Sequence, residues 1–361
     1  MYEGLTVGVV VPAYNEEGYV GDVIDGIPAC IDRAYVVEDG STDGTWAEIT
    51  SHAEARNNDH DGAFDRLVVP IRHDENRGVG GAIKTGYQRA REEGIDVTAV
   101  LGGDDQMDPS VLTEYFDPIA RGEAEYVKGN RFADPSHWEA MPRFRLFGNV
   151  VLSYLTKIAS GYWGLMDSQN GYTAIAHSAL ETTDIDGMYE YYGYCNDLLV
   201  RLNEADVTVA DLPRSSEYAY SDDWKSHIDY KEYIPRVSAM LARGFVRRLV
   251  RKYLLTDYNP IAPLYGVGTV GLLGGVAGLV RSLLGGGDSD TGSWTLTTVV
   301  SALVFLGATE LDRQENEPLQ ANLSDEAPGD AGPPDRTETE KAAADAGIAG
   351  EDGNTPLQNE P

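Results

Sequence analysis

Val100-Leu101-Gly102-Gly103-Asp104-Asp105-Gln106-Met107-Asp108-Pro109 joins an apolar run to a string of carboxylates. The apolar run, residues 97–101, predicts a short buried strand. Asp108 and Pro109 are the residue types that favour a helix cap and a first helical turn, so a helix is expected next. The polar residues between strand and helix therefore lie at the carboxyl end of a strand, where open α/β sheets bind their ligands.

The chemistry of this segment suits a divalent cation. Carboxylate and carboxamide oxygens, as in Asp104 and Gln106, are the hard ligands that Mg²⁺ or Mn²⁺ prefers when it is held jointly with the phosphates of a nucleotide. A polar turn that merely caps the next helix would look similar. The segment by itself leaves both interpretations open.

Apolar runs and helical patterns alternate through the first third of the chain. The expected strands cover residues 6–11, 34–37, 67–71, 97–101 and 125–128. Strands that alternate with helices predict an α/β fold with a mostly parallel sheet and helices on both faces. The polar segments all follow strand ends, so we expect them on one edge of that sheet.

Four of these polar segments carry a family resemblance. They are Val-Val-Pro-Ala-Tyr-Asn-Glu at 10–16, Glu-Asp-Gly-Ser-Thr-Asp-Gly-Thr at 38–45, Asn-Arg-Gly at 76–78 and Gly-Asp-Asp-Gln-Met-Asp-Pro at 103–109. In order and spacing they resemble the family 2 glycosyltransferases, which have the GT-A fold. Within that family the chain resembles the dolichyl-phosphate mannose or glucose synthases, over roughly its first two thirds and its membrane anchor.

The resemblance implies a pocket for a nucleotide sugar. Pro12, Tyr14 and Glu16 would line this pocket, and Asp39 would accept hydrogen bonds from the base. The alternative for Asp39 is simple capping of its turn.

The metal site implied by the resemblance has one departure. Asp104 and Gln106 match the metal-binding part of the family's Asp-x-Asp motif, with Mg²⁺ or Mn²⁺ as the cofactor. The usual first Asp of that motif falls on Gly102, which has no side chain to offer. Asp105 stands where the family often has Gly, and it is our candidate to compensate beside the nucleotide.

The implied reaction is an inverting transfer of a hexose, from a donor of the UDP-glucose or GDP-mannose type, to a polyprenyl (dolichyl) phosphate. Asp104 would act through the metal ion that it holds, which would neutralise the leaving nucleoside diphosphate. Arg131 resembles a family arginine that binds phosphate. Its alternative role is a surface salt bridge. Asp197 matches the acidic residue that the family carries near the acceptor, with an exposed helix acid as the alternative. Residues 225–227 stand where the family has a loop with Ser and Lys near the substrate phosphates, but this match is looser than those of the four motifs.

The last third predicts a membrane anchor. Basic residues at 243, 247, 248, 251 and 252 accompany an apolar stripe, which is typical of an amphipathic segment on an anionic membrane surface. Apolar runs at 261–284 and 294–308 predict a transmembrane hairpin. We therefore divide the chain into a catalytic domain (1–229), interfacial helices (230–258), a hairpin (259–311) and a disordered acidic tail (312–361).

Composition narrows the possible partners. The chain has 361 residues and a formal net charge of -31, so nucleic acid is not an expected partner. Two cysteines, with no secretory signal before residue 7, fit a reducing compartment. Together with the basic cluster before the hairpin, this predicts a multi-pass protein of the cell membrane, with the catalytic domain and both termini in the cytoplasm.

Rival functions remain at this stage. Processive polysaccharide synthases usually carry Gln-x-x-Arg-Trp, and none of the five tryptophans here follows an arginine. A transferase that extends a lipid-linked glycan is a closer alternative. From a different class, a non-catalytic nucleotide-sugar sensor or membrane scaffold would account for Gly102.

Overall fold

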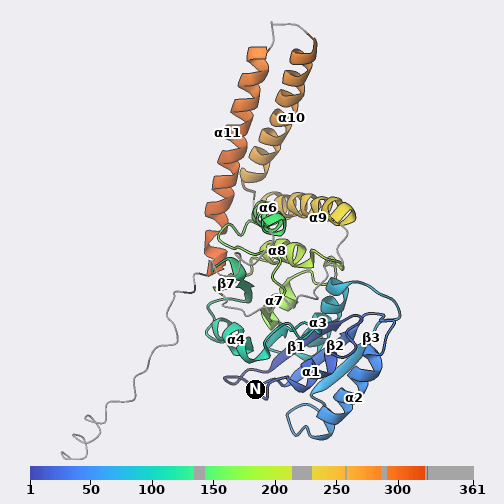
Figure 1. Ribbon diagram of the computed structural model, residues 1–361. Helices are drawn as coiled ribbons and strands as arrows, with labels where there is room; N and C mark the ends of the chain where they lie inside the picture. The colour runs from blue at the N-terminus through green and yellow to red at the C-terminus, as the bar shows by residue number, and fades with distance from the viewer. Residues whose placement is uncertain (134–142, 214–229, 257, 286–290, 322, 324–361) are drawn as a thin grey trace, which may run out of the picture. The chain divides into compact units, whose positions relative to one another are not determined.

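The computed structural model describes residues 1–133, 143–213, 230–256, 258–285, 291–321 and 323 (Figure 1). The segment 225–227 therefore lies outside the described residues. Four parallel strands form one half of the sheet: β1 (Val7–Ala13), β2 (Arg33–Glu38), β3 (Val68–Arg72) and β4 (Val97–Val100). All four coincide with strands expected from the apolar runs.

The other half of the sheet is mixed. Its strands are β5 (Tyr126–Asn130), β6 (Thr173–Ala176), β7 (Val209–Pro213) and β8 (Gln320–Ala321), and the full order is β3-β2-β1-β4-β6-β5-β7-β8. β6 was not predicted, and it runs antiparallel to both β4 and β5. Two successive reversals leave β5 parallel to β4, so the carboxyl end of β5 lies on the same edge as those of β1 to β4.

Helices cover both faces of the sheet, as predicted. One core contains Val7, Val9 and Val11 of β1 and is covered by α1 (Val20–Asp25), α2 (Thr45–Asn58) and α4 (Leu112–Ala120). The alternate side chain, Val10, belongs to a second core, as the two-residue period of a strand requires. The second core is covered by α3 (Val79–Glu93), α7 (His177–Thr182) and α8 (Tyr194–Glu204).

Helices of the C-terminal region pack against α8. α9 (Tyr230–Val250) contacts α6 (Arg143–Ser160) and α8, and continues into a π-helical turn, η3 (Arg251–Thr256). The described residues also include short 3-10 turns at η1 (Pro109–Val111), η2 (Arg131–Ala133) and η4 (Glu317–Leu319).

Two long helices form an antiparallel hairpin, α10 (Ile261–Gly285) and α11 (Thr291–Asn316) (Figure 1). By length and composition both are apolar enough to cross a membrane, and they bury only 11% of their most apolar windows. A Cβ added at Gly271 would clash with Ser301 Oγ, and one added at Gly275 would clash with Thr298 Oγ1. These glycines therefore let the helices approach closely.

A buried ionic network joins the foot of this hairpin to the rest of the protein. Arg248 and Asp312 are both fully buried, and the guanidinium donates to the two carboxylate oxygens at 2.9 and 2.8 Å. Tyr253 and Tyr265 also donate to Asp312, at 2.5 and 3.3 Å. Buried charges are tolerated only when they are paired and hydrogen-bonded, as here.

This network corrects two predictions. The tail was expected to begin at residue 312, but helix α11 continues to Asn316 and β8 then pairs with β7. The chain remains helical beyond residue 312 because the Asp312 carboxylate is paired with the buried guanidinium of Arg248. The basic cluster is also not a simple membrane-facing stripe: Arg248 points inward, and Lys252 forms an ion pair with Asp206 at 2.6 Å.

Candidate active site

The loop after β4 is pressed against the end of β1. The Gly103 backbone N–H donates to the carbonyl oxygen of Pro12 at 3.2 Å, and a Cβ at position 103 would lie 2.7 Å from that oxygen. Only glycine allows this approach. The next residue but one, Asp105, has a φ of 54°, so the loop turns sharply there and leaves Asp105 exposed.

Asp104 lies inside this turn. Its Oδ1 accepts a hydrogen bond from the Gln106 backbone N–H at 3.3 Å. Burial, and then the neighbouring charge of Asp105, raises the pKa of the Asp104 carboxyl. A Cβ at Gly102 would come within 2.8 Å of Asp104 Oδ1, so an acid at that position would crowd Asp104 in its present conformation.

Glu16 is a third carboxylate near Asp104 and Asp105. Its backbone N–H donates to Thr45 Oγ1 at 2.8 Å, which fixes the loop after β1 against the start of α2. Burial raises the pKa of Glu16 to about 7, with further contributions from the charges of Asp104 and Asp43. Burial, and then the charges of Glu16 and Asp104, raise the pKa of Tyr192.

Asp39 holds the neighbouring loop in place. Its Oδ1 accepts hydrogen bonds from His73 Nδ1 at 2.7 Å and from the Arg77 N–H at 2.9 Å, and its Oδ2 accepts one from the Gly78 N–H at 2.7 Å. The residue is almost completely buried. Asp39 therefore shapes the Asn-Arg-Gly segment that begins α3, and Oδ2 keeps more acceptor capacity than Oδ1.

Arg131 is held by the carboxylate of Asp167. Its Nε and one terminal nitrogen donate to the two oxygens of Asp167, both at 2.7 Å, and its backbone N–H donates to Asp167 at 3.0 Å. Burial raises the pKa of the Asp167 carboxyl, but the hydrogen bonds and the charge of Arg131 lower it more, so this pKa lies below its usual value. The bidentate edge expected to receive a phosphate is thus occupied by Asp167 in this conformation.

Asp197 is not in contact with the donor-side residues described above. It lies in the first turn of α8 and is buried, so it is not an exposed helix acid. Its contacts within the described part of the chain are with Arg201 at 2.6 Å, the Tyr189 N–H at 2.9 Å and Arg247 at 3.7 Å. The structure therefore links Asp197 to α9, and no direct contact joins it to Asp104 or Glu16.

The structure thus brings together most of the residues expected on the donor side. Glu16 and Asp104 are electrostatically coupled. Pro12 lies near the end of β1, and the loops that carry Tyr14, Asp39, Asp105 and Gln106 follow neighbouring strands at the same sheet edge. Sequence reasoning missed the roles of His73 and Tyr192. Within the described ranges, no group of three or more His, Cys, Asp or Glu side chains is arranged to hold a metal ion by itself.

Comparison with known proteins agrees with this arrangement. The family described as "Glycosyl transferase family 2" matches residues 8–183. The chain is 30% identical to the UDP-N-acetylglucosamine–dolichyl-phosphate N-acetylglucosaminyltransferase of Methanococcus voltae, over 58% of this chain and 85% of that protein. The chain belongs to glycosyltransferase family 2.

Other similar proteins were also found. The undecaprenyl-phosphate mannosyltransferase of Micrococcus luteus is 25% identical, over 58% of this chain and 82% of its own length. Among solved structures, the glucosyl-3-phosphoglycerate synthase of Mycobacterium tuberculosis in complex with Mn²⁺, UDP and phosphoglyceric acid has a TM-score of 0.46 and 17% identity, over 69% of this chain and 78% of that one. In this family the sheet edge described above is the candidate donor site.

Proposed function

We propose that this protein transfers a hexose or N-acetylhexosamine from a nucleotide sugar to a polyprenyl phosphate at the cytoplasmic face of a membrane. The observation that carries the proposal is the Asp104 loop, which faces Glu16 at the sheet edge of a chain that also has two long apolar helices. The relatives from Methanococcus voltae and Micrococcus luteus act on lipid phosphates, as their names state. The resemblance of four ordered motifs supports the same class of donor.

On the donor side, Pro12, Tyr14 and Asp39 would surround the nucleoside. Asp104 and Gln106 would hold Mg²⁺ or Mn²⁺, with Asp105 close by. The fit is reasonable because Mg²⁺ is usually bound by one or two carboxylates together with substrate phosphates and water, not by a full protein cage. When bound, the cation would neutralise the charge of the departing nucleoside diphosphate.

On the acceptor side, the chemistry needs little from the protein. An oxygen of the lipid phosphate forms the new bond to the anomeric carbon, while the bond from that carbon to the nucleoside diphosphate breaks. Phosphate monoesters are already ionised near neutral pH, so a general base is not required. The protein's contribution is then positioning and charge stabilisation.

Arg131 is our candidate for contacting the lipid phosphate. Its pair with Asp167 would orient the guanidinium, and its approach to the phosphate would require either another edge of the guanidinium or an exchange of partners. Asp197, through Arg201 and Arg247, would maintain the packing of α8 against α9 beside the acceptor. We retain it as a positioning residue for the acceptor side.

The test is a transfer assay with the full chain purified in detergent. Radiolabelled UDP-glucose, UDP-N-acetylglucosamine and GDP-mannose are each offered with polyprenyl phosphate, and in parallel with the water-soluble acceptor 3-phosphoglycerate. We expect organic-extractable label from at least one donor, dependent on the lipid and lost on chelation of divalent cations. Efficient transfer to 3-phosphoglycerate without any response to lipid would contradict the proposal.

A further inference from the structure

The surface of α9 that precedes the hairpin has an open groove with mixed chemistry. The groove has a volume of about 670 Å³ and is lined by Arg243, Val246, Arg247, Val250, Arg251 and Leu255. We call it the basic groove. Its three arginines are spaced four residues apart, so they form one stripe that runs along α9 and into η3. Val246 and Leu255 are 58% and 75% exposed, which leaves apolar surface uncovered beside the charges.

The charges of the basic groove are only partly neutralised. Glu204 accepts from Arg247 at 2.7 Å and from Arg251 at 3.4 Å, so one carboxylate serves two guanidinium groups. Asp197 lies 3.7 Å from Arg247 but is already paired with Arg201. Among the described residues, no carboxylate lies within salt-bridge distance of Arg243. The basic groove therefore keeps excess positive charge in a chain whose net charge is -31.

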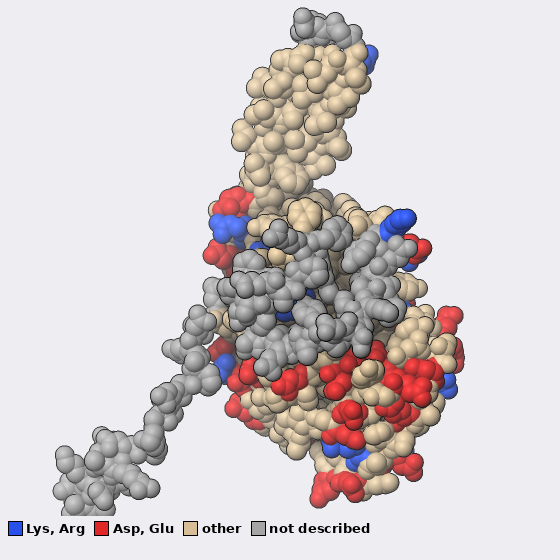
Figure 2. Space-filling model, in the orientation of Figure 1, with Lys and Arg blue, Asp and Glu red and all other residues tan. Residues whose placement is uncertain are grey.

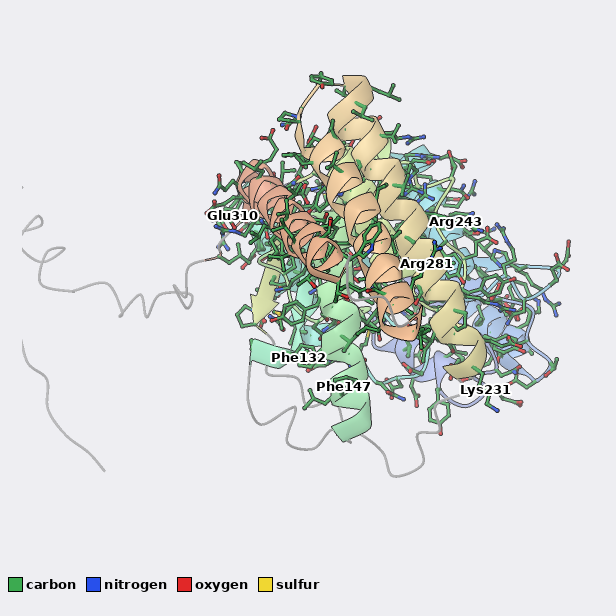
Figure 3. All side chains as sticks on the ribbon, turned by 90° about the horizontal axis from the view of Figure 1, so that it is seen from above. Phe132, Phe147, Lys231, Arg243, Arg281 and Glu310 are labelled. Atoms are coloured by element: carbon green, nitrogen blue, oxygen red, sulfur yellow. The ribbon has the colours of Figure 1, made fainter. Side chains whose placement is uncertain are left out.

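The position of the basic groove indicates which anion it meets. Leu255 lies six residues before Ile261, where α10 begins, and both α9 and η3 contact α10. Seen along the hairpin in Figure 3, Arg243 lies on α9 beside the two long helices. Figure 2 shows that acidic side chains gather on the sheet domain, whereas the visible face of the hairpin carries almost no charge. If the hairpin crosses a bilayer, the groove lies near the headgroups.

We propose that the basic groove binds the headgroup of an anionic phospholipid of the bilayer, distinct from the acceptor lipid. The guanidinium groups of Arg243 and Arg251 would contact the phosphate, and Val246 and Leu255 would contact the adjoining glycerol and first methylenes. This site would hold α9 on the membrane against the repulsion between the acidic sheet domain and an anionic bilayer. The inference rests on the membrane placement proposed above but not on glycosyl transfer.

Two other anions fit the basic groove less well. Inorganic phosphate would leave the exposed valine and leucine side chains uncovered, and the groove has room for about twenty water molecules at ~30 Å³ each. The acidic residues after position 324 would satisfy the charge, but that segment has almost no large apolar residues. A phospholipid supplies both a negative headgroup and apolar surface.

The test measures lipid binding to the detergent-purified full chain by native mass spectrometry, with no nucleotide sugar present. Phosphatidylglycerol and phosphatidylcholine with identical acyl chains are titrated separately. For the natural chain we expect tighter binding of phosphatidylglycerol. Arg243→Ala/Arg251→Ala should weaken this binding about 25- to 30-fold, since each basic residue near an anionic headgroup contributes ~1 kcal/mol, and leave phosphatidylcholine unchanged.

The matched control is Arg236→Ala/Arg281→Ala, which removes two exposed charges outside the basic groove. We expect it to retain phosphatidylglycerol like the natural chain. An equal loss in the control, or no preference of the natural chain for phosphatidylglycerol, would overturn the proposal. Displacement of phosphatidylglycerol by equimolar polyprenyl phosphate would instead assign the groove to the acceptor and also overturn it. Because no donor is present, these outcomes are independent of whether the protein transfers sugar.

Discussion

The buried pair of Arg248 and Asp312 should couple the hairpin to the catalytic domain, and a double-mutant cycle can test this. Asp312→Leu would leave the Arg248 guanidinium buried without its carboxylate, and would also remove an acceptor from Tyr253, Tyr265 and Asn316. Removing one member of a buried ion pair typically costs about 3–5 kcal/mol. Arg248→Met should cost less, because these three donors continue to surround the Asp312 carboxylate.

The double variant Arg248→Met/Asp312→Leu should recover most of the loss, because an apolar pair of similar volume leaves no uncompensated charge. The assay is thermal unfolding of the detergent-purified full chain, followed by tryptophan fluorescence. At ~2–4 °C per kcal/mol for a chain of this size class, Asp312→Leu should lower the midpoint by about 6–20 °C. If the losses of the single variants simply add in the double variant, Arg248 and Asp312 are not coupled and the reasoning fails.

Three further predictions concern the sheet edge. Burial and nearby carboxylates raise the pKa of Glu16 from 4.5 to about 7, so the protonated form stabilises the fold and this contribution is lost as pH rises through about 7. Glu16→Gln should therefore raise the unfolding midpoint at about pH 8.5 but not at about pH 5; an equal shift at both pH values would exclude the electrostatic cause. Asp104→Ala should reduce transfer about 100-fold or more without lowering the unfolding midpoint, and near-normal activity of Asp105→Ala would show that Asp105 does not replace the acid missing at Gly102. Arg131→Ala should raise the lipid concentration needed for half-maximal transfer while calorimetry shows unchanged donor affinity; loss of donor binding alone would place Arg131 on the other substrate.

The first half of the fold was predictable because its signals are local. Each parallel strand is a short apolar run that ends in a polar loop, and parallel strands necessarily bring those loops to one edge. β6 escaped detection because it has only four residues, Thr173–Ala176, in a region without clear periodicity. β8, with two residues at 320–321, was hidden in a segment whose composition predicts disorder.

The residues of the candidate site could be predicted from the sequence, but their hydrogen-bond and ion-pair partners could not. Arg131 was identified from its motif, whereas its pairing with Asp167 depends on a contact across 36 residues that periodicity cannot reveal. His73 gave no signal, because a single histidine after a strand has many possible roles, and only the structure shows it bonded to Asp39. Arg248 looked like its neighbours in the basic cluster, and its partner lies 64 residues away.

The mass of the lipid product tests the proposed reaction most directly. Purified full chain is incubated with the active nucleotide sugar and polyprenyl phosphate, and the organic phase is examined by mass spectrometry. The proposal predicts a product equal to the lipid phosphate plus one sugar residue, with no additional phosphate, and the nucleoside diphosphate as the other product. A lipid that gains a sugar together with a phosphate, with release of the nucleoside monophosphate, would contradict attack by the lipid phosphate at the anomeric carbon.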